Sequence, residues 1–203
     1  MPNPSPEASL HAATDAGVEA GLLRGSLAGD LDAFNRLVEL HQRLVFNICL
    51  RMLGSPTAAE DATQEAFISA YRNIATFRGQ SFRAWLTRIA ANACTDELRR
   101  RSRRQAVSLD APFAGDEAPP DVPDRAAGPE EAALRADQRR RIQAALLELP
   151  ADQRLAVVMC DIQGFAYEDI AEAMRTSVGT VKSRIARGRE KLRRLLATEH
   201  SGG

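Results

Sequence analysis

A basic segment near the C-terminal end most constrains the fold of this chain. Residues 175–194 hold eight Lys and Arg residues against one acid, Glu190. Apolar and small residues recur in and around this segment three or four positions apart, which is the spacing of one face of an α-helix. They are Val178, Val181, Ile185, Gly188, Leu192 and Leu195. The pattern predicts a helix with one buried face and cationic outer faces, because a solvated helix normally mixes both signs of charge.

The residues just before this segment predict a partner helix. Residues 167–174 are amphipathic, residues 175–177 form a short break, and Ser177 is suited to cap the helix that follows. Ala171 is small enough to let two helices approach closely. Together the two helices form a helix-turn-helix pattern, whose second helix enters the major groove of DNA. Lys, Arg, Ser and Thr side chains contact phosphates and base edges there, so we expect this part of the chain to bind DNA.

The charge of the chain is unevenly distributed, although its formal net value is zero. Residues 78–104 hold eight arginines against two acids, whereas residues 105–137 hold eight acids against two arginines. Two basic surfaces are therefore separated by an acidic segment. Because residues 105–129 are also rich in Pro, Gly and Ala, they are expected to form a flexible linker.

Helical spacing of apolar residues extends through the rest of the chain, and the alternating pattern of a strand is absent from the sequence. We therefore expect an all-α fold with two small helical domains that move separately on the flexible acidic linker, the second ending in the helix-turn-helix. The polar N-terminal residues 1–24 are expected to be a disordered tail. Helices are predicted at about residues 32–53, 57–74, 81–104, 129–149 and 151–163, with "GSP" at 54–56 marking a helix start.

The helix predicted over residues 57–74 has two different faces. One contains Asp61, Gln64, Glu65, Ile68 and Arg72, and the opposite one contains Ala66, Phe67, Ala70, Tyr71 and Ile74. The second face is the predicted core face. The first is by itself more typical of a solvated surface, although an exposed Ile68 in its middle indicates a contact with another protein.

The next helix combines aromatic residues with cations. Phe82, Trp85, Leu86 and Ile89 form its predicted buried face, while Arg88 and Asn92 follow the other side. The preceding loop, "FRGQS", offers a flexible glycine and several hydrogen-bond donors. Aromatic and cationic residues beside such a loop suit single-stranded or distorted nucleic acid, in which unstacked bases need a pocket.

Several classes of function find no support in the sequence. Three Cys and three His residues show no metal-ligand spacing, and no phosphate-binding loop or nucleophile motif occurs. We therefore expect no metal, no cofactor and no catalytic residue. A nucleic-acid-modifying enzyme is the hypothesis with the least support. There is no signal peptide and no apolar run of membrane length, so no membrane insertion and a cytoplasmic location are expected.

Three stretches resemble regions two and four of bacterial RNA polymerase sigma factors of the extracytoplasmic-function (ECF) type. They are "DATQEAFISAYRNIATFRG", "WLTRIAANACTDELRRR" and "YEDIAEAMRTSVGTVKSRIARGREKL". The resemblance implies a region 2 domain over residues 25–104 and a region 4 domain over residues 130–197. It implies a non-enzymatic subunit for promoter-specific initiation, with core RNA polymerase (β′ clamp and β flap), promoter DNA and an anti-sigma factor as partners. A free-standing helix-turn-helix repressor or activator remains the alternative, which leaves the first domain and the acidic linker unexplained.

The resemblance also implies roles for individual residues. Arg175 stands at a turn position where the family often has Gly, so a positive φ is expected there. The implied polymerase-binding residues are Asp61, Gln64, Glu65 and Ile68. Those for the minus-ten promoter element are Arg78, Gly79, Gln80, Ser81, Phe82, Arg88 and Asn92, and those for the minus-thirty-five element are Thr180, Lys182, Ser183, Arg184 and Arg187.

Overall fold

The computed structural model describes residues 6–78, 81–107 and 129–198, and within these ranges every regular element is a helix. This confirms the predicted all-α fold. A 3₁₀ turn (Ile74–Thr76) follows α3, and a π-helical segment (Val158–Ile162) follows α6. The α-helices are α1 (Pro6–Leu27), α2 (Leu31–Leu53), α3 (Pro56–Asn73), α4 (Phe82–Val107), α5 (Pro129–Leu147), α6 (Ala151–Val157), α7 (Tyr167–Met174) and α8 (Val178–Thr198).

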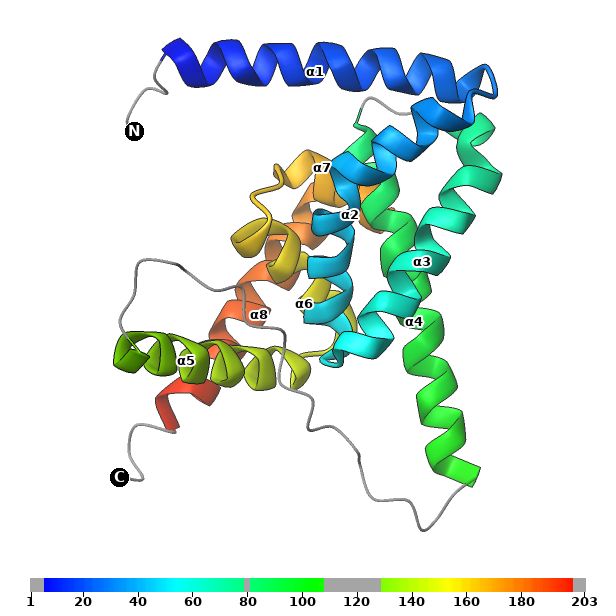
Figure 1. The fold of residues 1–203 in the computed structure, drawn as a ribbon. Helices are drawn as coiled ribbons and strands as arrows, with labels where there is room; N and C mark the ends of the chain where they lie inside the picture. Colours follow the sequence, from blue (N-terminus) through cyan, green and yellow to red (C-terminus); the bar gives the residue numbers. More distant parts are fainter. Residues whose placement is uncertain (1–5, 79–80, 108–128, 199–203) are drawn as a thin grey trace.

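Helices α2, α3 and α4 pack side by side and form the body of an N-terminal unit (Figure 1). The packing is close because α3 presents small side chains to its neighbours, and Ala59, Ala66 and Ala70 are fully buried. The start of α3 follows the prediction, since Ser55 is its N-cap and Pro56 its first residue. The Ser55 hydroxyl accepts a hydrogen bond from the Ala58 amide at 3.3 Å, which satisfies one of the free amides at the start of the helix.

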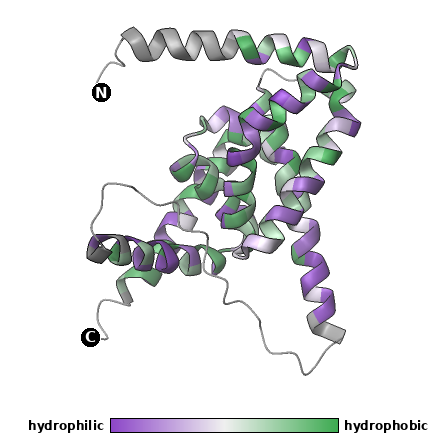
Figure 2. Ribbon diagram, viewed as in Figure 1, coloured by the Kyte–Doolittle hydropathy of each residue, from purple (hydrophilic) through white to green (hydrophobic). Residues whose placement is uncertain are grey.

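The end of α4 differs in character from its beginning. Its last turns extend past the other helices of the N-terminal unit (Figure 1) and are strongly hydrophilic (Figure 2). Arg99, Arg103 and Arg104 are exposed there. The buried part of α4 thus supports the core, while its end presents a basic surface.

Helices α5 to α8 form a C-terminal unit in which α8 carries the basic segment. The predicted apolar stripe of α8 faces inward, with Val181 fully buried and Ile185 2% exposed. Gly188 lies against α6, where a Cβ atom at this position would stand 2.7 Å from Cγ2 of Val157. The absence of a side chain at Gly188 therefore permits the close contact between α6 and α8 that orients the basic helix.

The N-terminal region differs from the predicted disordered tail, because the backbone is helical from Pro6 to Leu27. The C-terminal half of this helix is anchored to the bundle. Leu22 and Leu23 pack against the core, and Glu19 pairs with His41 of α2 at 2.8 Å. The polar composition of this segment predicted a tail, but these few contacts anchor the C-terminal half of α1 to the bundle.

The two units pack against each other, in contrast to the expectation of separately moving domains. The buried apolar residues form one continuous cluster that includes members of both units. Helix α4 contacts α7, and α2 contacts both α5 and α6. The arrangement buries apolar side chains that two small helical domains could not cover alone.

The C-terminal end of α2 forms the polar part of this interface. The last four carbonyl groups of a helix lack partners within the helix. Gln143 of α5 donates to the carbonyls of Leu50 and Arg51, at 3.3 Å each, and accepts a hydrogen bond from the Arg51 guanidinium at 3.0 Å. Arg154 of α6 donates to the carbonyl of Met52. The C-terminal unit thus supplies partners that the end of α2 requires.

Arg154 also holds its own unit together. It is 7% exposed, and its guanidinium donates to the carbonyls of Leu147 and Leu149 at 2.6 and 3.0 Å. Burial lowers the pKa of this guanidinium from its ordinary high value, although it remains charged at neutral pH. One buried cation therefore links the end of α2 to the turn between α5 and α6.

We expect Arg154→Met to lower the free energy of unfolding by about 1–3 kcal/mol, because it leaves buried carbonyl groups without a donor. Arg140→Met is the matched control, since Arg140 is exposed and pairs with Asp137 one helical turn away, at 3.1 Å. Chemical denaturation of the two variants and the wild type measures the difference. Equal losses in both variants would contradict the role given to Arg154.

Candidate polymerase- and DNA-binding surfaces

The outer face of α3 presents acidic, polar and apolar side chains together. Asp61, Gln64 and Glu65 are exposed, and Ile68 is 46% exposed in the same region. The assignment of faces is confirmed for these four residues. Tyr71, which was expected in the core, is instead 45% exposed, and its ring makes an edge-to-face contact with Phe34 with the ring centres 5.0 Å apart.

The loop before α4 is described only in part, since Gly79 and Gln80 lie outside the described residues. Arg78 is exposed, and its guanidinium donates to the Ala75 carbonyl at 2.6 Å. Ser81 is half-buried and caps α4 by accepting from the Ala84 amide at 3.2 Å. These contacts fix both sides of the loop.

Phe82 lies on the buried face of α4, as the helical spacing predicts. Its side chain is 3% exposed and stacks on Trp85, with the ring centres 5.5 Å apart. Phe77 and His41 complete this aromatic cluster. The burial confirms Phe82 as part of the predicted buried face of α4, and its role in the minus-ten contact stays a prediction.

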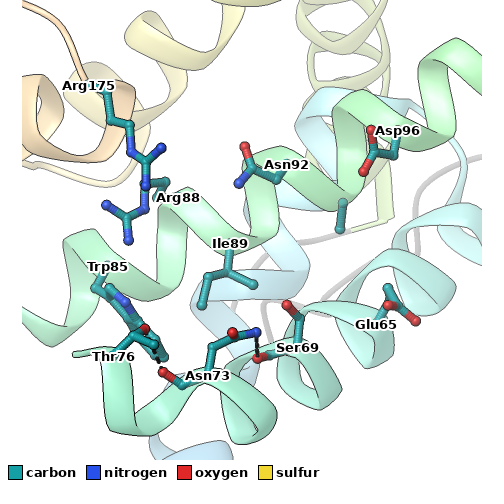
Figure 3. Close-up of a pocket in the computed structure, with 11 residues that line it drawn as sticks. Glu65, Ser69, Asn73, Thr76, Trp85, Arg88, Ile89, Asn92, Asp96 and Arg175 are labelled. Atoms are coloured by element: carbon teal, nitrogen blue, oxygen red, sulfur yellow. Dashed lines mark hydrogen bonds between the residues drawn. The ribbon is translucent and has the colours of Figure 1, made fainter.

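Arg88 and Asn92 lie in a crevice between α3 and α4, at the edge of the contact with the C-terminal unit. The crevice has a volume of about 320 Å³ and is also lined by Trp85 of α4 and by Arg175 from the turn after α7. Figure 3 shows the guanidinium groups of Arg88 and Arg175 next to each other at one end of the crevice. The two residues implied for minus-ten recognition thus share their surroundings with the helix-turn-helix.

The turn between α7 and α8 has the expected geometry. Arg175 has φ 48°, and it is the one non-glycine residue with positive φ in the described part of the chain. Its amide donates to Glu172 and the Thr176 amide donates to Ala171, as in a left-handed helix end. The Ser177 hydroxyl then accepts from the Thr180 amide at 3.1 Å, which confirms it as the cap of α8.

The basic residues of α8 fall into two groups. Arg184 is 26% exposed and pairs with Asp152 of α6 at 2.9 Å, and Arg189 binds both carboxylate oxygens of Asp161. In contrast, Arg187 is exposed and takes part in none of the ion pairs found among the described residues, and Lys182 is exposed with its ammonium 5.9 Å from the ring centre of Tyr167. Lys182 and Arg187 are therefore more available to a ligand than Arg184.

Thr180 and Ser183 lie near these cations, at the N-terminal end of α8. The hydroxyls of Thr180 and Ser177 are 2.9 Å apart, and the Ser183 hydroxyl donates to the Thr180 carbonyl at 2.8 Å. Both residues are half-exposed. The first two turns of α8 thus bring together hydroxyl, ammonium and guanidinium groups of the kinds that contact phosphates and base edges.

Asp161 and Arg189 tie α8 to the segment after α6. The hydrogen bonds from the Arg189 guanidinium hold the pKa of the Asp161 carboxyl below its ordinary value. Partial burial opposes this effect but does not overcome it. The carboxylate therefore stays ionised to a lower pH than an ordinary aspartate, and it keeps its contact with Arg189 of α8 there.

Sequence reasoning missed the residues that join the two units. The positions of Gln143 and Arg154 in the interface could not be predicted, because a lone Gln or Arg in an amphipathic helix is normally a surface residue. Arg175 was noticed only for its backbone conformation, and its nearness to Arg88 depends on the packing of α7 on α4. No local sequence pattern contains that information.

Two further searches concern the residues that the structure describes. Among them, no cluster of three or more His, Cys, Asp or Glu side chains has the geometry of a metal site. Cys49 and Cys94 are buried, as expected for small apolar residues, and Cys160 is half-buried. None of the described helices combines the length and the apolar character needed to span a membrane.

Comparison with protein families and with individual relatives gives a consistent result. The family model for Sigma-70 region 2 matches residues 37–104, and the model for Sigma-70 region 4 matches residues 139–192. The RNA polymerase sigma-H factor of Pseudomonas aeruginosa is 39% identical over 83% of this chain and 88% of its own length. The ECF RNA polymerase sigma factor SigW of Bacillus subtilis is 39% identical over 83% of this chain and 91% of its own length. The chain belongs to the ECF sigma factors.

Other comparisons agree with this family. The ECF sigma factor SigE of Mycolicibacterium smegmatis is 37% identical over 84% of this chain, which spans 64% of that relative's length. Among solved structures, the sigma factor RpoE of Bartonella quintana, in complex with the anti-sigma factor NepR, has a TM-score of 0.66 and 25% identity. The similarity covers 82% of this chain and 98% of that one. The N-terminal unit of this sigma factor thus contains region 2, and the C-terminal unit contains region 4.

The lowered pKa of Asp161 predicts how the stabilising pair between Asp161 and Arg189 depends on pH. Because the folded-state pKa is depressed, the pair stabilises the fold above the unfolded-state pKa of about 3.9 and loses its effect as pH falls through the lower folded value. Asp161→Asn should therefore reduce the melting temperature at about pH 7, and the deficit should shrink toward about pH 3. Melting curves of both proteins at several pH values test this. A deficit that is constant with pH would mean that the Asp161 charge does not contribute.

Proposed function

We propose that this chain is a promoter-specificity subunit of RNA polymerase, which binds the core enzyme through α3 and recognises promoter DNA through α4 and α8. It is not an enzyme by itself, because the catalytic centre belongs to the polymerase, and it acts in the cytoplasm with that enzyme. The observation that supports this function most strongly is the presence of two different surfaces in one chain. One surface is acidic and apolar, and the other is basic and lies on a helix-turn-helix.

The α3 surface fits a protein partner better than a nucleic acid. Asp61 and Glu65 would repel a phosphate backbone, whereas the exposed Ile68 beside them offers apolar area that a protein can bury. Gln64 adds an exposed hydrogen-bonding group. We assign Asp61, Gln64, Glu65 and Ile68 to the contact with the core polymerase.

The first two turns of α8 fit the major groove. Lys182 and Arg187 project from α8 as exposed cations, and Thr180 and Ser183 place hydroxyl groups beside them. Arg187 can make a bidentate contact with a guanine edge, whereas Arg184 is held by Asp152 and contributes mainly charge. We assign these residues to the minus-thirty-five element.

The minus-ten element is assigned to exposed and half-buried polar residues around the start of α4. Arg78 and Ser81 flank the loop, and Arg88 and Asn92 follow on the same helix. Because Arg88 is half-buried and faces the crevice beside Arg175, the packed arrangement of the two units restricts the access of DNA to this side chain. Core polymerase would hold region 2 and region 4 apart at the spacing of the two promoter elements.

An anti-sigma factor is a further proposed partner. The structure of the Bartonella quintana relative contains such a factor, and a second similar structure, of CnrH with the cytosolic domain of CnrY, has a TM-score of 0.62 and 26% identity. The similarity to CnrH covers 89% of this chain and 98% of that one. A regulator of this kind would keep the chain from the polymerase until it is released.

A free-standing repressor or activator is the competing function, and a pull-down separates the two. The tagged full-length chain is mixed with purified core polymerase and with promoter DNA in separate experiments. We expect retention of the core polymerase and poor binding of duplex DNA by the chain alone. Tight sequence-specific DNA binding without polymerase, together with no retention of the core enzyme, would favour the repressor.

Charge reversal on α3 tests the polymerase contact. Asp61→Arg with Glu65→Arg should weaken binding to core polymerase by about 1–3 kcal/mol, if the two carboxylates make desolvated charged contacts. Glu39→Arg, at an exposed acid on α2, serves as the control. Affinity is measured by titration of labelled chain with core enzyme, and circular dichroism checks the fold. Binding that is unchanged in the double variant would remove this surface from the proposal.

Two arginines of α8 should respond differently to truncation. Arg187→Ala should cost about 1–3 kcal/mol at promoters with the preferred base and relax the preference at one or two base pairs. Arg194→Ala should weaken binding about equally across promoters, because Arg194 pairs with Glu190 near the end of α8 and would serve phosphates or solvent. The measurement is a promoter-variant binding series at two salt concentrations, with polymerase present. Equal, sequence-independent losses in both variants would contradict the recognition role of Arg187.

A further inference from the structure

Two cations, one from region 2 and one from region 4, line the crevice between α3 and α4. Arg88 comes from α4 and Arg175 from the turn between α7 and α8, and their guanidinium groups are adjacent in Figure 3. Neither side chain takes part in an ion pair or hydrogen bond found within the described residues. Like charges held this close repel each other, so a site of this kind favours a bound anion.

The acids that line the crevice do not neutralise this pair. Asp96 is paired with Arg99 at 3.5 Å, and Glu65 belongs to the exposed face of α3. In Figure 3 both carboxylates lie at the end of the crevice away from the two guanidinium groups. The crevice is therefore polarised, with its cationic end at the contact between the two units.

A second hollow continues from the same residues. It has a volume of about 330 Å³, and it is lined by Arg88, Asn92 and Arg175 together with Arg184 and Asp152. Asp152 is already engaged, since it pairs with Arg184 at 2.9 Å. Three arginines from both units thus line the second hollow together with one carboxylate, and the Asn92 amide adds a neutral donor.

We propose that this crevice binds a small molecule that carries one or two phosphate groups. The anion bridges Arg88 of region 2 and Arg175 of region 4, and it thereby holds the two units in the packed arrangement. Planar guanidinium groups match phosphate oxygens by paired hydrogen bonds, and the volume is within the range of small-molecule sites. The bound anion would occupy a residue that we assign to promoter recognition. This last consequence rests on the proposed function, whereas the binding itself does not.

Trp85 provides a direct measurement of binding. It is the only tryptophan in the chain and lines the crevice beside Arg88. The full-length protein is titrated with inorganic pyrophosphate at constant ionic strength, in the absence of DNA and polymerase. We expect a saturable change in tryptophan fluorescence. Because a ligand that binds the folded state raises its melting temperature, we also expect a concentration-dependent rise in that temperature.

Variants on the two sides of the crevice locate the site. Arg88→Gln and Arg175→Asn should each weaken pyrophosphate binding at least about tenfold, as expected when one of two charge-assisted contacts is lost. Asn is chosen at position 175 because it tolerates a positive φ. Arg36→Gln, at an exposed arginine of α2, is the matched control and should bind as the wild type does.

Three results would overturn the proposal. The first is that neither fluorescence nor melting temperature changes with pyrophosphate. The second is that Arg36→Gln loses as much affinity as the crevice variants, which would indicate unspecific attraction. The third is that Arg175→Asn binds as the wild type does, which would place any site within region 2 alone. Because no promoter or polymerase is present, failure here leaves the proposed function untouched.

Discussion

The packing of the two units of this sigma factor depends on hydrogen-bond donors for the carbonyl groups at the C-terminal end of α2. Its last carbonyl groups lie in the contact between the two units, where an unpaired polar group would cost free energy. Gln143 and Arg154 supply the donors, and the left-handed Gly54 closes the helix by donating to Leu50. The polar contact therefore determines how region 4 is oriented on region 2. The apolar cluster around it stabilises the contact by burying apolar area, but the hydrophobic effect has no preferred direction.

This placement has consequences for both proposed DNA surfaces. Arg187 and Lys182 of α8 remain exposed, whereas Arg88 and Asn92 of α4 face the crevice shared with Arg175. The packed arrangement therefore leaves one proposed promoter surface open and covers part of the other. The α3 residues that we propose for the polymerase contact are exposed in the same arrangement.

The sequence predicts the local features of this molecule well and its long-range contacts poorly. The sequence alone predicts the helical spacing, the Ser55 and Ser177 caps and the buried face of α8, because these features depend on neighbours three or four residues away. The positive φ of Arg175 could be expected from the resemblance to the family. The roles of Arg154 and Gln143 could not, since their partners lie 102 and 92 or 93 residues away. The helix over Pro6–Leu27 could not be predicted for the same reason, because its C-terminal half is anchored by contacts with α2 and the core.

The most direct test of the central claim is run-off transcription with purified core polymerase and a library of genomic promoters. The account predicts that adding the chain produces transcripts from a limited set of promoters, which share two sequence elements at a fixed spacing. Core polymerase alone should not produce these transcripts. If the chain adds no promoter-specific transcripts, or if it only represses those made by another sigma factor, the assignment as a promoter-specificity subunit is contradicted.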